Sequence, residues 1–233
     1  LNGEAWITAK PHFYATDLLT LDAKSMLIHE VSLNGKKIEY DYDDYKIILK
    51  LPKKYGKEEA FTVYIKYTAR PEKVKEKGSA AITSAKGLYF INADGADKNK
   101  PTQIWTQGET EGSSCWFPTI DAPNQKTTQE IYITVPNKYV TLSNGALISQ
   151  TKNAGSRTDY WKMDQKHAPY LFFMGVGAFE IIEDTYKDIA VNYYVEKEYA
   201  KYAKDIFGNT PEMMQFFSEK LGVEYPWNKY SQI

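Results

Sequence analysis

Hydrophobic and polar side chains alternate along most of the first four-fifths of the chain. In 61–67, 45–51 and 131–135, apolar side chains stand at every second position, with mostly polar ones between them. A period of two places the apolar set on one face of an extended segment, which is typical of a half-buried strand. The pattern therefore predicts β-strands at all three places.

Short turn signals separate these segments. Asn34-Gly35 favours a two-residue hairpin, and Asn144-Gly145 predicts a second hairpin between 139–142 and 146–150. The run 170–179 is so continuously apolar that we expect a strand buried on both sides. Many short strands with frequent turns indicate a mainly β fold, an antiparallel β-sandwich or a pair of curved sheets.

The period lengthens near the C-terminus. The sequence predicts a helix over 198–207 and another over 210–221, with Thr210 as N-cap, Pro211 in the first turn and Gly222 as the stop. The residues expected on one apolar face of the second helix are Met213, Met214, Phe217 and Leu221.

This change of period predicts a domain boundary near 184–188. Residues 1–186 form the expected first domain, and 187–233 are expected to begin a second domain with a strand followed by helices. The segments 71–79 and 93–100 are predicted loops. Both ends of the chain lie inside strand-like alternation, so we expect it to be a piece of a longer protein.

Composition narrows the class of protein. The 233 residues include 29 Lys and Arg against 30 Asp and Glu, and the absence of a long basic run argues against nucleic acid as the main partner. No apolar run approaches the ~18 residues of a membrane-spanning helix. The single Cys115 excludes a disulfide within the chain. The compartment stays open between periplasmic or secreted and cytoplasmic.

Familiar catalytic and metal-binding motifs are absent from the sequence. His29-Glu30 begins like a His-Glu-x-x-His zinc helix, but Leu33 occupies the second ligand position and the segment alternates like a strand. Cys115 has no neighbouring His or second Cys that would form a nucleophilic or metal-binding pair. No nucleophile elbow, phosphate-binding loop or dinucleotide fingerprint occurs.

The densest candidate chemistry lies at 105–126. If 106–111 is extended, Gln107, Glu109 and Glu111 project from one face and offer an amide and two carboxylates to a cation such as an ammonium. The alternative interpretation is an acidic, solvated loop. Two prolines stiffen a turn around Asp121, whose carboxylate is expected to accept hydrogen bonds from nearby backbone amides.

The order of these motifs resembles the aminopeptidase N and leukotriene hydrolase family of zinc aminopeptidases. The motifs are Gln107-x-Glu109, Phe117-Pro118-x-x-Asp121-x-Pro123-x-x-Lys126, Ser143-Asn144-Gly145, the run 169–179 and Leu221-Gly222-Val223-Glu224-Tyr225-Pro226-x-x-Lys229-Tyr230. The resemblance implies that 1–186 is the family's curved β-saddle domain. It also implies that 187–233 begin a truncated α/β, thermolysin-like catalytic domain.

The resemblance further implies roles for the acidic segment. Glu109 would hold the free α-ammonium of a peptide, Gln107 would line the pocket for the first side chain, and Glu111 would support them. The implied partners are peptide N-termini and the rest of the catalytic domain. Zn²⁺ is the implied cofactor of the parent protein; its ligands and the catalytic residues would lie outside this chain, which alone is expected to be inactive.

One departure from the family stands within this stretch: Ser113-Ser114-Cys115 replaces the arginines that commonly precede Phe-Pro. Two other functions remain open. The same fold could serve as a non-catalytic scaffold or binding surface. The excess of aromatic residues, with 19 Tyr, 10 Phe and 5 Trp, could instead supply a carbohydrate-binding platform of exposed, coplanar rings, although Tyr is also common in ordinary strands.

Overall fold

The computed structural model describes residues 1–75 and 86–233, so the predicted loop at 71–79 lies partly outside the described residues. The chain is mainly β, with 51% strand and 14% helix, which confirms the predicted fold class. Most of the strands in the described residues pair antiparallel, whereas the last one adds in parallel. The chain divides into two compact units that interleave along the sequence.

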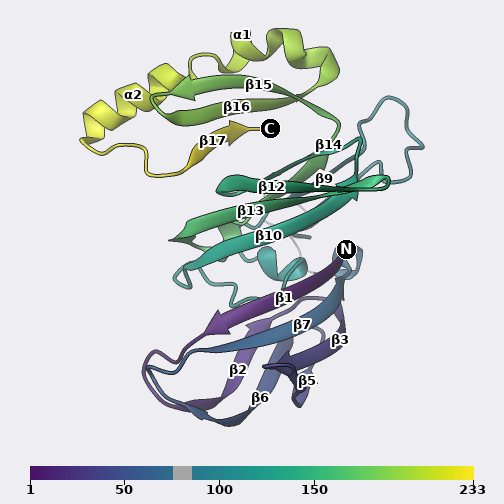
Figure 1. The fold of residues 1–233 in the computed structure, drawn as a ribbon. Helices are drawn as coiled ribbons and strands as arrows, with labels where there is room; N and C mark the ends of the chain where they lie inside the picture. The colour runs from purple at the N-terminus through teal and green to yellow at the C-terminus, as the bar shows by residue number, and fades with distance from the viewer. Residues whose placement is uncertain (76–85) are drawn as a thin grey trace. The chain divides into compact units, whose positions relative to one another are not determined.

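The first unit comprises Leu1–Tyr89, Thr106–Thr127 and His167–Phe172. Its strands are β1 (Asn2–Ala9), β2 (Thr16–Asp22), β3 (Met26–Leu33), β4 (Lys36–Lys37), β5 (Tyr40–Tyr42), β6 (Lys46–Tyr55) and β7 (Phe61–Ala69). They form two antiparallel sheets with the orders β1-β7-β3-β4 and β2-β6-β5 (Figure 1). Its short 3-10 helices are η1 (Pro71–Lys73), η2 (Ser113–Cys115) and η3 (Pro169–Leu171).

The second unit comprises Phe90–Trp105, Thr128–Lys166 and Phe173–Ile233. The strands that lie in it or enter it are β8 (Leu88–Ile91), β9 (Gln103–Thr106), β10 (Thr127–Pro136), β11 (Val140–Ser143), β12 (Ala146–Asn153), β13 (Ser156–His167), β14 (Met174–Gly177), β15 (Phe179–Tyr186), β16 (Ile189–Glu196) and β17 (Lys229–Gln232). Their sheet orders are β11-β14-β9-β8, β10-β13-β12 and β15-β16-β17. The helices η4 (Lys197–Tyr202), α1 (Ala203–Phe207) and α2 (Thr210–Leu221) precede the last strand.

The alternation predicted for the first unit is confirmed in its core. Val63 and Ile65 of β7 and Ile47 and Leu49 of β6 are fully buried, whereas Lys50 between the apolar positions is exposed. Residues of both sheets belong to one apolar cluster. Burial of these branched side chains is the main stabilising contribution, since each contributes about 1.5–3 kcal/mol.

The hairpin predicted at Asn34-Gly35 is also confirmed. Both residues have positive φ, 50° and 75°, and Leu33 of β3 pairs with Lys36 of β4 across the turn. A two-residue turn of this kind needs left-handed backbone at both central positions, which Asn and Gly tolerate best.

The hairpin predicted at Asn144-Gly145 is wrong, although strands form on both sides of it. β11 pairs with β14, and β12 pairs with β13, so the two flanking strands belong to different sheets. The Asn144 side-chain oxygen accepts a hydrogen bond from Phe173 N at 2.7 Å. The turn therefore leads the chain from one sheet into another instead of closing a hairpin. Which sheet each flanking strand joins depends on partner strands that are far away in the sequence.

The single buried strand predicted over 170–179 is only partly present. The run contains the end of η3, the four-residue strand β14 and the first residue of β15. All four residues of β14 are buried, as expected, but Leu171 is 45% exposed. Pro169 favours a turn at the start of the run, and that turn shortens the strand.

The predicted helix 210–221 is α2, and Gly222 ends it in the left-handed conformation with φ 66°. Thr210 is not its N-cap: the hydroxyl donates to Phe207 O at 2.7 Å, and Asn209 occupies the cap position. The predicted apolar face is present, since Met213, Met214, Phe217 and Leu221 line one groove, although only Met214 of them is buried. The buried positions of the helix are Thr210, Met214 and Ser218, and α2 packs against β15.

The predicted domain boundary between 186 and 187 falls in the turn of a hairpin. β15 and β16 pair along their whole length, from Phe179 opposite Glu196 to Tyr186 opposite Ile189. The predicted strand at 189–195 is thus present as β16, and the boundary itself stays a prediction.

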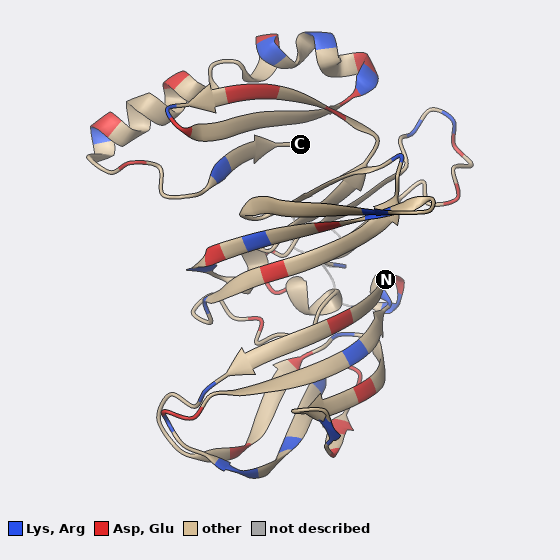
Figure 2. Cartoon of the chain, in the orientation of Figure 1, with Lys and Arg blue, Asp and Glu red and all other residues tan. Residues whose placement is uncertain are grey.

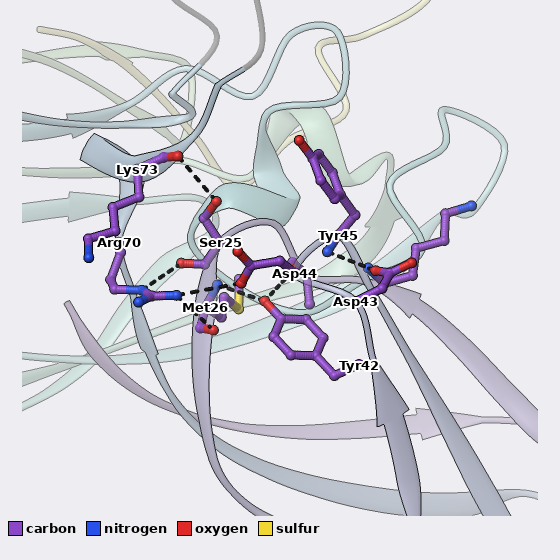
Figure 3. Close-up of polar contacts among 10 residues, drawn as sticks. Ser25, Met26, Tyr42, Asp43, Asp44, Tyr45, Arg70 and Lys73 are labelled. Atoms are coloured by element: carbon purple, nitrogen blue, oxygen red, sulfur yellow. Dashed lines mark hydrogen bonds and ion pairs between the residues drawn. The ribbon is translucent and has the colours of Figure 1, made fainter.

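A polar cluster holds two turns of the first unit together. The Tyr42 hydroxyl donates to Ala23 O and accepts from Met26 N, both at 2.8 Å (Figure 3). Arg70 donates to Ser25 O at 3.1 Å and to Met26 O at 3.3 Å. Burial raises the pKa of Tyr42 to about 12, so its hydroxyl keeps its proton throughout the ordinary pH range.

A half-buried lysine lies in the second unit. Lys229 of β17 donates to Ser143 O at 2.7 Å, and its ammonium lies 5.3 Å from the centre of the Trp161 ring. Burial lowers the pKa of Lys229 from 10.5 to about 8. The folded chain therefore releases this proton more readily than the unfolded chain.

Replacement of Tyr42 by Phe is expected to lower the free energy of unfolding by about 1–3 kcal/mol, because Met26 N and Ala23 O lose their shared partner. Urea denaturation measures the change. Tyr45→Phe is the control, because the Tyr45 hydroxyl makes no hydrogen bond within the described residues and its side chain is half exposed. Equal effects of the two substitutions would contradict the role of the hydroxyl.

The pKa of Lys229 predicts the pH dependence of stability. Between pH 8 and 10.5 the unfolded chain binds more protons at this residue than the folded chain, so its contribution to the free energy of unfolding rises with pH. The full rise is about 3 kcal/mol. Lys229→Met is expected to remove this rise in urea titrations across the window, whereas substitution of the exposed Lys152 by Met should leave it unchanged.

Candidate functional site

The acidic segment of the first unit is a turn and not a strand. β9 ends at Thr106, a turn covers Glu109 to Gly112, and η2 begins at Ser113. The extended conformation on which a shared face depended is therefore wrong, and the segment agrees with the alternative interpretation, an acidic loop. Gln107, Glu109 and Glu111 do not share the face of one strand.

Three glycines explain the tight course of this turn. Gln107 N donates to Gly87 O at 2.9 Å, and Gly112 N donates to Gly108 O at 2.7 Å. A Cβ on Gly108 would collide with Tyr170 O and lie 2.6 Å from Ser113 Oγ. Gly87 has φ 65°, and a Cβ there would collide with Gly112 O. Only residues without side chains allow the backbones to approach so closely.

Side-chain hydrogen bonds fix both ends of the turn. Lys24 Nζ donates to Glu111 O at 2.9 Å, and the buried Ser113 Oγ donates to Pro169 O at 2.8 Å. Ser113 lies in the Ser-Ser-Cys stretch that departs from the family pattern, so its hydroxyl gives that stretch a structural role. Lys24 lies far from the turn in the sequence, and local reasoning offered no signal for it.

Asp121 fulfils the expectation that its carboxylate accepts from nearby backbone. Its Oδ2 accepts from Ser114 N at 2.8 Å, and its own N donates to Asp22 Oδ2 at 3.0 Å. Burial raises the pKa of Asp121, while the Ser114 bonds and the charge of Lys24 oppose that rise. The carboxylate thus anchors η2 just behind the turn.

The candidate side chains differ in exposure. Gln107 is half-buried, whereas Glu109 and Glu111 are exposed. An exposed carboxylate on a fixed backbone is accessible to an incoming ammonium and can accept charge-assisted hydrogen bonds from it.

Charges elsewhere do not single out another site. Blue and red segments are interspersed along the elements of each unit (Figure 2). In residues 1–75 and 86–233, no group of three or more His, Cys, Asp or Glu side chains is arranged to hold a metal ion. Zinc therefore does not fit the side chains described. Nor does any helix in these ranges have the length and apolar composition needed to span a membrane.

Two pairs of aromatic side chains lie near the surface, and neither forms the predicted carbohydrate-binding platform. Tyr132 and Tyr160 lie nearly parallel at 4°, but their ring centres are 4.4 Å apart, so each covers a face of the other. Trp6 and Tyr64 are tilted by 48°. Neither pair places its rings side by side in one plane, so these two pairs do not favour the carbohydrate-binding alternative.

The fold and the motifs define a class of protein: a β domain of the kind found at the N-terminal side of zinc-dependent peptidases. The chain belongs to the Peptidase M1 N-terminal domain family, whose model matches residues 1–171. This confirms the resemblance seen in the sequence.

Two curated relatives match the chain over part of their length. The chain is 27% identical over 230 residues to a puromycin-sensitive aminopeptidase of Caenorhabditis elegans, covering 92% of this chain and 23% of that protein. It is 23% identical over 151 residues to the transcription initiation factor TFIID subunit 2 of Gallus gallus, covering 63% and 13%. The chain thus spans less than a quarter of the length of these curated relatives.

A solved structure shows the same fold. The M1 zinc metallopeptidase of Deinococcus radiodurans superposes with a TM-score of 0.76 at 17% identity, covering 99% of this chain and 51% of that one. At this identity the likeness concerns the fold.

Gly108→Ala is expected to destabilise the first unit by about 1–3 kcal/mol, because the new methyl group has no space beside Tyr170 O. Gly56→Ala is the matched control. Its Cβ would meet only the flexible end of Glu59 at 3.5 Å, so stability should stay equal or rise by up to about 1 kcal/mol. Thermal and urea unfolding measure both, and equal effects would contradict the packing argument.

Proposed function

We propose that this chain is the substrate-pocket part of a zinc-dependent aminopeptidase that removes N-terminal residues from peptides. The proposal rests mainly on one observation: the Gly-packed turn after β9 presents the exposed carboxylate of Glu109 from a fixed backbone. The aminopeptidase among the relatives supports this assignment.

Glu109 would recognise the charged amino terminus. A hydrogen bond between a carboxylate and an ammonium contributes about 1.5–3 kcal/mol, or roughly one to two orders of magnitude in affinity. An internal peptide bond offers no ammonium, and a blocked terminus has lost its charge. The contact therefore selects the free end of a peptide and places its first residue at a fixed distance from Glu109.

The neighbouring residues would shape the same pocket. Gln107 is half-buried beside Gly87, so its amide can line the space for the first side chain without carrying charge. Glu111 would add negative potential, while its backbone carbonyl is held by Lys24. The turn thus combines one specific acceptor with a more general attraction for cations.

The chemical step would take place elsewhere in the parent protein. The zinc of this family activates water and polarises the scissile carbonyl when bound. The described residues offer no cluster that fits zinc. The steps proposed for this chain are therefore binding and orienting the peptide terminus.

A second candidate function is a non-catalytic binding or scaffold role with the same fold. The match to a transcription initiation factor subunit favours it, because that relative is named for a function other than peptide hydrolysis. Zinc content and hydrolysis of aminoacyl anilides by the natural protein that contains this chain distinguish the two. A metal-free, inactive protein would support the scaffold role.

For the aminopeptidase, Glu109→Gln is expected to reduce kcat/KM for substrates with a free amine by about 10- to 100-fold, since the ammonium loses a charged partner. The substitution conserves shape at an exposed position, so folding should be retained. Hydrolysis of aminoacyl anilides measures the effect.

Two controls accompany this experiment. Glu58→Gln, at an exposed position outside the turn, should leave kcat/KM unchanged, and Glu111→Gln should reduce it less than Glu109→Gln. An unchanged kcat/KM in Glu109→Gln would contradict the role of Glu109 in binding the amino terminus.

A further inference from the structure

The sequence contains three Asn-Gly pairs, at 2–3, 34–35 and 144–145, and the structure places them in three different environments. Asn followed by Gly is chemically special because the next backbone nitrogen can attack the Asn side-chain carbonyl, and Gly offers the least steric hindrance to that attack. Whether the attack happens in a folded chain depends on how firmly the pair is held.

Two of the pairs are held by hydrogen bonds and packing. Asn2 lies in β1, its Oδ1 accepts from Thr68 Oγ1 at 2.8 Å, and the Tyr67 ring lies against Gly3. The pairing of β1 with β7 fixes the backbone at this point. Ring closure at Asn2 would require both the side-chain bond and the strand pairing to break.

The pair at 144–145 is held by different contacts. Asn144 Oδ1 accepts from Phe173 N at 2.7 Å, and the Gly145 backbone packs so tightly on Lys162 O that a Cβ would collide with it. The peptide between the two residues therefore has little freedom to rotate, and the hydrogen bond from Phe173 N restrains the Asn144 side chain.

The pair at 34–35 lacks such contacts. Both residues are exposed, the Asn34 side chain makes no hydrogen bond within the described parts of the chain, and a Cβ on Gly35 would meet nothing within 4 Å. The turn connects β3 to the two-residue strand β4, so it can open without loss of the core.

We propose that Asn34 is a site of spontaneous deamidation in the folded protein and that Asn2 and Asn144 are protected. Gly35 N bonds to Asn34 Cγ, its proton leaves with the side-chain nitrogen as ammonia, and a succinimide results. Water then opens either carbonyl of the ring to give aspartate or isoaspartate. The sum is one water consumed and one ammonia released, with no oxidation or reduction.

The modification changes the hairpin chemically. Each event adds one negative charge beside the exposed Lys36 and Lys37. Isoaspartate also adds a methylene group to the main chain, which a two-residue turn with fixed register does not accommodate. The expected change is local to the β3–β4 end of the sheet and is independent of the proposed peptidase function.

The test compares the three pairs within one molecule. The folded chain is kept in mildly alkaline buffer, and peptide mapping by mass spectrometry follows each Asn over time. Asn34 is expected to convert at least about tenfold faster than Asn2 and Asn144, since reaction there requires less local opening. In concentrated denaturant the three rates should agree within about threefold, because the unfolded chain offers no protection.

Equal rates at the three positions in the folded chain, or a faster rate at Asn2 or Asn144, would overturn the proposal. Near-ultraviolet circular dichroism during the incubation confirms that the chain stays folded. Asn34→Gln is the variant control: its longer side chain disfavours ring closure, so the main acidic species on ion exchange should disappear. Persistence of that species would place the reaction elsewhere.

Discussion

The close approach of backbone at Gly87, Gly108 and Gly112 is the constraint on which the candidate site depends. Hydrogen bonds between backbone groups cross this contact, and the space for a Cβ at Gly108 is already filled by Tyr170 O and Ser113 Oγ. Since a strand would carry the residues away from this contact, the chain turns directly after β9. The exposure of the two glutamates therefore follows from Gly108 and Gly112, which flank them, and from the contact of Gly112 with Gly87.

Polar groups that are buried behind the turn keep it in place. Ser113 Oγ uses its donor on Pro169 O, and Asp121 accepts from Ser114 N despite a pKa that burial raises. Leaving a buried polar group unpaired costs more free energy than its hydrogen bond contributes. Backbone conformations of the turn that would break one of these bonds are therefore unfavourable. The positions of exposed side chains are thus determined by buried ones, and a substitution behind the turn acts on the site without touching a ligand.

Local information in the sequence predicted the fold better than the site. The strands β6, β7 and β10 and the Asn34-Gly35 hairpin follow from alternation and turn chemistry within a few residues. The Asn144-Gly145 turn and the buried face of α2 depend on which distant strands they meet, which no local pattern specifies. The turn at 109–112 was expected only in the alternative interpretation of an acidic loop. Its tight course depends on the contact of Gly112 with Gly87, which is distant in the sequence and which no local pattern specifies.

The residues that stabilise the fold also differ from those that could determine the function. The family match covers residues 1–171, and the relatives include both an aminopeptidase and a transcription initiation factor subunit, so similar segments occur in proteins with different functions. The buried glycine contact and the Asp121 anchor serve the fold under either function. The carboxylate of Glu109 differs from them, because it is exposed and contributes no hydrogen bond to the turn. Replacing such a side chain can change binding without changing the stability of the fold. Glu109 is therefore the residue of the turn at which a function in binding can be tested separately from folding.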